Sequence, residues 1–322
     1  MQLHLITCVG VEADLGYLPH FLAHYTAMGI APANIHILSQ ASHPDHAGLD
    51  AADEIARTFD VLPALRWIAP YTSRSMWEQR RALQKDKVAP HDFVISADVD
   101  EFHEYPVPPA ELCAWCSNAG YEVIQGPFID RIAASGRLEE LPPPGQSIFD
   151  TYPVQTELRH TLAGITDDIN LGGSVKLMLF RGTVEPGLGG HGTLPQYRVR
   201  PHALGMHLSR FHGLEDPQMR FDLPFLVHHF KWTAGVDDRM RKRLLTPGIS
   251  PAGKAYAERL LEFFDGAAEF DIDALCIRDP DKNDPADWKK SVEIWRRMAR
   301  VQQLREQWWA VKNRVRKLTR VA

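Results

Sequence analysis

The stretch that decides the fold is Phe93-Val-Ile-Ser-Ala-Asp-Val-Asp-Glu-Phe102. Its first five residues form a short apolar run, which is typical of a strand buried on both faces. Three carboxylates then follow within four positions, at Asp98, Asp100 and Glu101. Carboxylates crowded at a strand end repel one another, so we predict a divalent cation between them, and oxygen ligands suit Mn²⁺ or Mg²⁺. In an extended segment Asp98 and Asp100 point to the same side, so that one binds the metal and the other holds a water or a hydroxyl group.

Upstream of this stretch, short apolar runs alternate with helical patterns. Such a rhythm is typical of βαβ units, so we predict an α/β fold with a mostly parallel central sheet. Ligands of these sheets bind at the carboxyl ends of the strands, and the acidic motif follows such an end. The predicted strands are residues 3–9, 35–38, 65–68 and 93–97, and the predicted helices are residues 17–29, 51–59 and 75–87.

Downstream of the acidic motif, one predicted strand carries two adjacent histidines, His228 and His229. Side chains alternate along a strand, so the two imidazoles are expected on opposite faces. His229 is the candidate metal ligand alongside Asp100, while His228 is expected in the core. Lys231 would share the face of His229. The three predicted strands of this half are residues 121–129, 175–180 and 225–232.

Composition sets the broad class of the protein. The chain has 322 residues, is 44% hydrophobic and carries a net charge of only -5. It is long enough to bury a large core, and this charge argues against a nucleic-acid binder. The four cysteines form no disulfide framework, and the lone pair Cys113 and Cys116 reads as core rather than as a zinc or redox site. No signal peptide or membrane span is apparent, so a soluble protein of the reducing cytoplasm is expected.

The last segment has a different charge. Residues 289–322 contain eleven Lys or Arg and two Glu, a balance of +9, while the preceding residues carry -14. Apolar residues recur there at helical spacing, which predicts a basic amphipathic helix over residues 287–319. Docking on the chain's own acidic domain is favoured, and peripheral contact with an anionic membrane or a partner protein are the alternatives. The apolar positions are Ile294, Met298, Val301, Trp308, Val311, Val315 and Leu318.

Two other acidic motifs deserve comparison. A calcium-binding EF-hand loop beginning at Asp98 would need an oxygen ligand at its fifth position and Gly at its sixth, where Phe102 and His103 stand. Phosphatases of the haloacid dehalogenase type also place two aspartates after a strand, but they want Thr or Val where Phe102 lies. A metal-dependent phosphohydrolase of this type therefore stays an alternative.

The segment 95–102, Ile-Ser-Ala-Asp-Val-Asp-Glu-Phe, resembles the DxDEF motif of glycosyltransferase family 2-like proteins with the GT-A fold. Glu12 stands where that family has an Asn-Glu pair after the first strand, although Val11 replaces the Asn. Gln79 also fits the family's layout, and His228-His-Phe-Lys-Trp232 resembles its HxxK-type segment. The resemblance covers residues 1–235, which leaves 236–322 as a helical C-terminal extension.

This resemblance implies a GT-A-like, metal-dependent glycosyltransferase. It would transfer a sugar, with inversion, from a nucleoside diphosphate sugar to a hydroxyl of a carbohydrate or lipid-linked acceptor. A UDP-sugar is the favoured donor, although residues 39–45 replace the usual nucleotide loop. Mn²⁺ or Mg²⁺ would neutralise the diphosphate leaving group. The expected metal ligands are Asp98, Asp100 and His229, and the expected donor contacts are Glu12, Asp98, Lys176 and Lys231.

An inverting transferase also needs a carboxylate that deprotonates the acceptor hydroxyl. Asp130 is the candidate, Asp167 and Asp168 compete with it, and a buried ion pair between Asp130 and Arg131 is the structural alternative. The glycine-rich residues 189–192 could admit a sugar or phosphate close to the backbone. Loss of turnover would turn the same site into a carbohydrate or nucleotide-sugar binding protein, which is the non-catalytic alternative.

Overall fold

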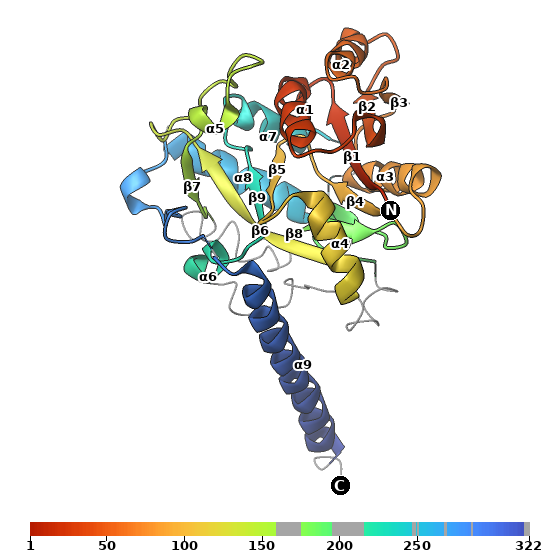
Figure 1. The fold of residues 1–322 in the computed structure, drawn as a ribbon. Helices are drawn as coiled ribbons and strands as arrows, with labels where there is room; N and C mark the ends of the chain where they lie inside the picture. The colour runs from red at the N-terminus through yellow and green to blue at the C-terminus, as the bar shows by residue number, and fades with distance from the viewer. Residues whose placement is uncertain are drawn as a thin grey trace.

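The computed structural model describes residues 1–158, 175–194, 216–246, 249, 251–266, 269–284 and 286–318. Over these residues nine strands form one mixed sheet in the order β3-β2-β1-β4-β8-β6-β9-β5, with β7 paired to β6 (Figure 1). The predicted α/β class is confirmed. The strands are β1 (Leu3–Gly10), β2 (Ile35–Ala41), β3 (Leu65–Ile68), β4 (Phe93–Ser96), β5 (Glu101–Glu104), β6 (Val123–Ile132), β7 (Val154–Thr156), β8 (Val175–Arg181) and β9 (Leu226–His229).

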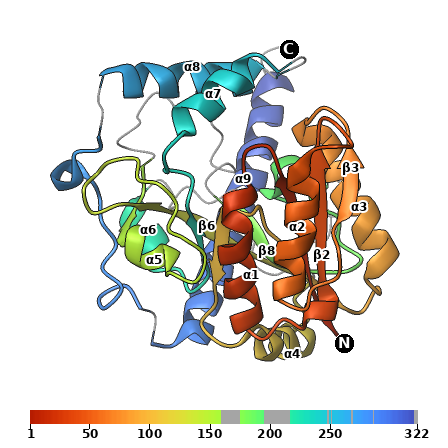
Figure 2. The same cartoon turned by 90° about the horizontal axis from the view of Figure 1, so that it is seen from above.

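The N-terminal half of the sheet, β3-β2-β1-β4, is parallel throughout. Alternate residues of β1 explain its continuous apolar sequence: Leu5 and Val9 belong to the core beneath α1 and α2, while Ile6 and Cys8 belong to the core with α3. A strand covered by helices on both faces has no solvated side. The helices of this half are α1 (Leu18–Ala27), α2 (Ala47–Thr58), α3 (Ser73–Lys87) and α4 (Pro109–Ala119), and α1 and α2 lie in front of the strands in Figure 2. Short 3₁₀ turns also occur before the C-terminal helices, at η1 (Leu15–Tyr17), η2 (Pro32–Asn34) and η4 (Leu188–Gly190).

Beyond β4 the sheet becomes mixed. Strand β8 is antiparallel to β4 and β6, and β9 runs parallel to β6 and antiparallel to β5. The chain therefore passes from β4, inside the sheet, to β5, at its far edge, within the acidic motif. The strand predicted over residues 225–232 is shorter than expected, because β9 ends at His229. The short helices α5 (Ile148–Thr151) and α6 (Pro217–Phe221) flank this half.

The C-terminal part is helical, with α7 (Val236–Leu244), α8 (Pro251–Gly266), η7 (Ile272–Ala274) and α9 (Trp288–Leu318). Helices α7 and α8 lie side by side (Figure 2), and α8 contributes Leu260 and Leu261 to a core shared with Trp232. This shared core fixes the two helices against the carboxyl-terminal end of β9.

Helix α9 projects away from the rest of the molecule (Figure 1). Its first turns are docked, since Val292 and Trp295 are buried in the main core. The favoured docking therefore holds for these turns alone, because the described apolar side chains farther along, from Met298 to Val311, are exposed. Across the described part of the chain, no helix combines the length and hydrophobicity needed to cross a bilayer.

The cysteines behave as the sequence suggests. Cys113 and Cys116 lie on α4 and are buried in the main core, and all four cysteines are free. Cys113 and Cys116 therefore pack in the core as small apolar side chains.

Candidate functional site

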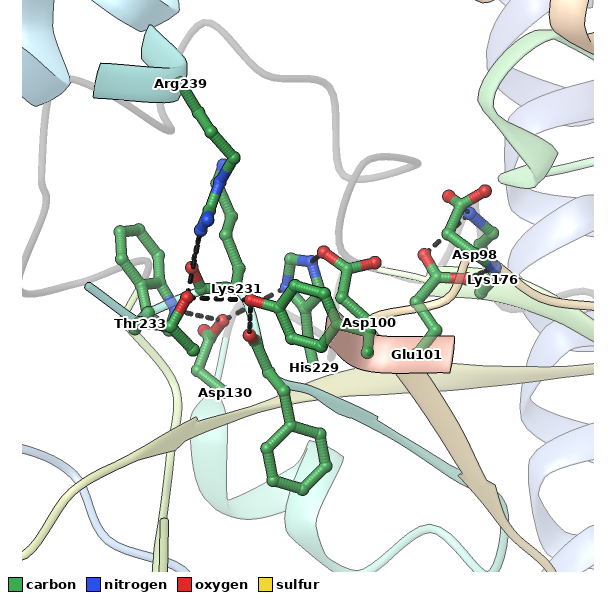
Figure 3. A network of polar contacts seen from close by, with 12 residues as sticks. Asp98, Asp100, Glu101, Asp130, Lys176, His229, Lys231, Thr233 and Arg239 are labelled. Atoms are coloured by element: carbon green, nitrogen blue, oxygen red, sulfur yellow. Dashed lines mark hydrogen bonds and ion pairs between the residues drawn. The ribbon is translucent and has the colours of Figure 1, made fainter. Parts of the chain in front are cut away.

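The acidic motif forms a tight turn between β4 and β5. The Glu101 backbone N–H donates to the Asp98 carbonyl at 2.9 Å, which closes the turn over Val99 and Asp100. This corrects the prediction of an extended segment, because turning the chain separates the two aspartates. In Figure 3 Asp98 faces Lys176 while Asp100 faces His229. The two carboxylates thus belong to two different clusters.

The first cluster neutralises Asp98. Its Oδ1 accepts from Arg80 Nη2 at 2.6 Å, and its Oδ2 accepts from Lys176 Nζ at 2.8 Å. Lys176 also donates to Glu101 Oε1 at 2.7 Å, and the other Glu101 oxygen accepts from the Asp98 backbone N–H at 3.0 Å. Arg80, Glu101 and Lys176 are all buried. Two cations and two carboxylates therefore balance each other inside the molecule, as buried charges require.

The pKa values follow from this balance. Burial opposes the charge of Asp98, but Lys176 and Arg80 outweigh it and hold the pKa of Asp98 well below its usual range. Burial, together with the neighbouring charge of Asp98, raises the pKa of Glu101 to about 7. Asp98 is thus the fixed anion of the cluster, and Glu101 is the carboxyl that can carry a proton near neutrality.

The second cluster is a line of three groups across the turn and two strands. His229 Nε2 lies 3.5 Å from Asp100 Oδ2, and His229 Nδ1 lies 3.4 Å from Asp130 Oδ1. Register explains the meeting, because β9 lies between β5 and β6 and His229 pairs with both Glu101 and Asp130. Asp130 is held further by the Trp232 indole at 2.7 Å and the Leu158 backbone N–H at 3.2 Å.

Both carboxylates favour a charged imidazole. Burial opposes the charge of His229, but its contacts with Asp100 and Asp130 raise the pKa to about 9. His229 in turn lowers the pKa of Asp100 and Asp130 against the effect of burial. In the state described, all three groups are charged at neutral pH.

The two histidines of β9 face opposite sides, as predicted. His228 is buried and its Nε2 lies 2.7 Å from Glu104, on the face away from Asp100. Arg131 likewise faces away from Asp130 and donates to the Tyr152 carbonyl at 2.9 Å. The Asp130–Arg131 ion pair, which was the structural alternative to a catalytic Asp130, does not form between these two side chains.

Lys231 lies beyond the end of β9 and turns toward α8. Its ammonium contacts the Tyr256 hydroxyl and lies 4.1 Å from the centre of the Tyr256 ring. Burial and the nearby Arg243 lower the pKa of Lys231 to about 7. Arg239, from α7, donates to the Lys231 carbonyl at 3.0 Å and to the Thr233 hydroxyl at 3.1 Å (Figure 3).

Glu12 stands at the carboxyl end of β1, apart from these clusters. It accepts hydrogen bonds from the Ser42 hydroxyl and, at 2.8 Å, from the Ser42 backbone N–H. Ser42 follows β2 directly, so the two residues link the ends of adjacent parallel strands. Ligands of open α/β sheets bind at such ends.

The predicted metal ligands are brought together only in part. Asp100 and His229 face each other, whereas both oxygens of Asp98 accept from cations. Within the residues that the structure describes, no three His, Cys, Asp or Glu side chains are grouped to hold a metal ion. Lys176 is committed to Asp98 and Glu101. Asp167 and Asp168 lie outside the described residues.

The glycine-rich residues 189–192 cover the first cluster. Gly190 has a φ of 68°, and a side chain there would meet the Trp77 ring and the Lys176 chain. The loop is held by the Gln125 amide, which donates to the His191 carbonyl at 2.8 Å. Because the loop packs closely against Lys176, glycine at position 190 is explained by packing alone.

Sequence reasoning missed several groups of the site. Gln79 was singled out from the sequence, whereas its neighbour Arg80 was missed. Arg80 falls on the apolar face of α3 with Met76, Trp77 and Leu83, and a charged residue on such a face indicates a buried partner. Asp14 was missed too; burial and the charge of Asp100 raise its pKa to about 7. No local signal marks Tyr256, because α8 meets Lys231 only in the folded chain.

Comparison with known proteins gives loose similarities. No protein-family model matches the chain, and no curated protein matches its sequence. Residues 1–349 of S. aureus TarS superpose with a TM-score of 0.33 and 12% identity, over 82% of this chain and 72% of that chain. The same fragment in complex with UDP-GlcNAc gives 0.35 and 13%, over 82% and 73%. Mouse xyloside xylosyltransferase 1 gives 0.25 and 12%, over 60% and 64%. Scores this low leave the site to be judged on its own geometry.

Proposed function

We propose that this chain is a metal-dependent glycosyltransferase that moves a sugar from a nucleoside diphosphate sugar, with a UDP-sugar favoured, to a hydroxyl acceptor with inversion. The observation that carries the proposal is the placement of Asp98 and Asp100 where β4 ends, next to β1 and its following Glu12. The strand order reverses between β1 and β4, and α/β sheets bind ligands at such a switch point. Glu12 and Ser42 would face the nucleoside.

The residues present fit a divalent cation at Asp100 and His229. Two ligands that are each about 2.1 Å from one ion lie roughly 3 to 4 Å apart. The 3.5 Å between Asp100 Oδ2 and His229 Nε2 falls within this range and is long for a hydrogen bond. Mn²⁺ or Mg²⁺ held there would neutralise the diphosphate leaving group. Asp98, with its oxygens held by Arg80 and Lys176, would position the turn beside the donor rather than bind the ion.

Asp130 suits the orientation of His229 better than proton abstraction. Histidines that bind metals commonly donate their second ring N–H to a carboxylate, which fixes the ring. Asp130 stands at that second nitrogen, and its oxygens already accept from Trp232 and Leu158. The lowered pKa makes Asp130 a weak base, although its general-base role stays a candidate.

The phosphohydrolase alternative would need Asp98 as the attacking nucleophile. Both Asp98 oxygens accept from Arg80 and Lys176, and the pKa of Asp98 is lowered accordingly. A carboxylate stabilised this strongly is a poor nucleophile, so the arrangement favours glycosyl transfer. The acceptor would be a carbohydrate or a lipid-linked sugar. Exposed apolar and basic residues of α9 would bring the protein to an anionic membrane surface.

A thermal-shift panel of nucleoside diphosphate sugars, with and without Mn²⁺, tests this function. One donor should raise the melting temperature with Mn²⁺ present, and sugar release or transfer should follow. Asp100→Asn should abolish the Mn²⁺-dependent shift, while the matched surface change Asp86→Asn should leave it intact. Full transfer in excess EDTA would refute the metal role. Binding without any product would favour the non-catalytic alternative.

A further inference from the structure

Three basic residues, Lys231, Arg239 and Arg243, gather beside the Asp100–His229 pair, and their direct polar contacts are to neutral groups. Lys231 contacts the neutral hydroxyl of Tyr256, and Arg239 donates to a carbonyl and a hydroxyl. Arg243 lies one turn farther along α7, with its guanidinium 5.9 Å from the centre of the Tyr256 ring. Over the described residues, no Asp or Glu forms an ion pair with Lys231, Arg239 or Arg243.

Such a group differs from the other charged residues of the site. Lys176 and Arg80 are each matched by a carboxylate within 2.8 Å. Lys231 is half-buried between the rings of Trp232 and Tyr256, and burial and Arg243, with a smaller effect of Arg239, lower its pKa against the opposing effect of Asp100 and Asp130. Cations held together in a partly buried place destabilise one another. An anion bound among them would offset this repulsion.

We infer that Lys231, Arg239 and Arg243 form a subsite for a phosphoryl group of a bound substrate. Lysine offers a point charge and arginine a planar fork that matches phosphate oxygens. In Figure 3 Lys231 and Arg239 lie on the opposite side of Asp100 and His229 from Asp98 and Lys176. This inference rests on the proposed function, since a glycosyltransferase offers two such groups: the diphosphate of the donor and a phosphate carried by the acceptor.

The position of the subsite gives the C-terminal helices a part in substrate binding. Arg239 and Arg243 are four residues apart, so they share one face of α7. The core of Trp232, Met240, Leu260 and Leu261 fixes that helix beside Lys231. Tyr256 of α8 holds the lysine ammonium in place from the other side.

Calorimetric titration of the full chain tests the subsite. Arg239→Gln and Arg243→Gln are compared with Arg241→Gln, which changes the same helix at an exposed arginine paired with Asp265. The probes are UDP against uridine, in the presence of Mn²⁺, and glycerol 3-phosphate against glycerol, with UDP saturating. Each subsite variant should weaken one phosphorylated probe about tenfold, the loss of one charge-assisted bond. Uridine, glycerol and Arg241→Gln should show no change.

The two probe pairs separate the sources of the phosphoryl group. Weaker UDP binding assigns the subsite to the donor, and weaker glycerol 3-phosphate binding with normal UDP assigns it to the acceptor. Arg243 is exposed, so its variant keeps the fold even where Arg239→Gln does not. If neither variant differs from Arg241→Gln with either probe, the inference is wrong. Failure of the wild-type chain to bind any nucleotide sugar would instead refute the proposed function. In that case titration with inorganic phosphate would still measure whether the subsite binds a phosphoryl group.

Discussion

At the scale of single residues, Lys176 is a buried cation that neutralises two carboxylates. It is the shared partner of Asp98 and Glu101, and all but 2% of its side chain is buried. Lys176→Met leaves Glu101 without its cation and Asp98 with Arg80 alone, so we expect a loss of about 3–5 kcal/mol in the free energy of unfolding. Urea denaturation measures this loss. Lys85→Met, at an exposed lysine paired with Glu185, should cost less than about 1 kcal/mol.

A second substitution checks the cause of that loss. Glu101→Gln removes one of the two carboxylates and should recover part of the stability of Lys176→Met. If Lys176→Met unfolds like Lys85→Met, or if the double variant is less stable than the single one, the charge balance described for this cluster is wrong.

His229 and His228 offer a paired test on neighbouring residues. His229→Ala removes the group between Asp100 and Asp130, so turnover should fall at least about 100-fold with a smaller change in stability. His228→Ala removes the bond to Glu104 and the packing against Phe149 instead, so it should lower stability by roughly 1–3 kcal/mol and largely spare turnover. Steady-state kinetics and urea denaturation of both variants measure the split. Equal kinetic losses would contradict the assignment of faces.

At the scale of elements, the sequence predicts what local patterns control. Helices α1 and α3 and strands β1 to β4 appear close to where periodicity places them, because each is decided by residues within one turn or one strand. Helix α2 begins at Ala47, four residues before the predicted start. Strand β5 was missed, since its partner β9 lies more than a hundred residues away. The ion pairs of Lys176 were missed for a similar reason, because its partners Asp98 and Glu101 lie 78 and 75 residues away in the sequence. Alternation along β9 did predict the opposite faces of His228 and His229, because that rule is local.

Helix α9 can be tested as an element in two parts. Ending the chain after Arg297 removes only the exposed turns, so the melting temperature should stay unchanged. Ending it after Asp287 also removes the buried Val292 and Trp295, and the melting temperature should fall. If the exposed turns bind anionic lipid, both truncations should abolish co-sedimentation with phosphatidylserine vesicles. That binding should weaken with salt, since each basic residue near the surface contributes about 1 kcal/mol.

Vesicle binding that survives the cut after Arg297 would contradict the membrane role of these turns. A lower melting temperature in the same truncation would show that they dock on a protein surface. Residues 289–322 carry a balance of +9 beside -14 for the preceding residues, so either outcome should be sensitive to salt.

At the scale of the whole molecule, buried titratable groups pull stability in opposite directions with pH. Burial first of all lowers the pKa of His24, His36 and His191 to about 4. Burial raises the pKa of Asp14 and Glu101 to about 7. As pH falls from 6.5 to 4, the histidines favour the unfolded state, which binds the proton first, while the two carboxyls favour the folded state. The profile of the whole molecule is the sum of these opposing contributions.

Substitution of one histidine measures the contribution of the histidines to this pH dependence separately. His24→Gln removes a group that is neutral when folded and charged when unfolded below pH 6.5. Relative to the wild type, the variant should gain stability by up to about 3 kcal/mol between pH 7 and pH 4.5. Urea denaturation across that range measures the difference. A difference between variant and wild type that is constant with pH would show that His24 titrates normally in the folded chain.

The pairing of Asp98 with Lys176 also has a consequence for protein synthesis. The two residues are 78 positions apart, and ribosomes add roughly 5 to 20 residues each second. The four parallel strands have thus left the peptidyl transferase centre about 4 to 16 seconds before the lysine that neutralises their acidic turn is made. During that interval the nascent sheet carries Asp98 and Glu101 at its open edge with Arg80 as their cation. A chain released before Lys176 is made would lack the cation that Asp98 and Glu101 share.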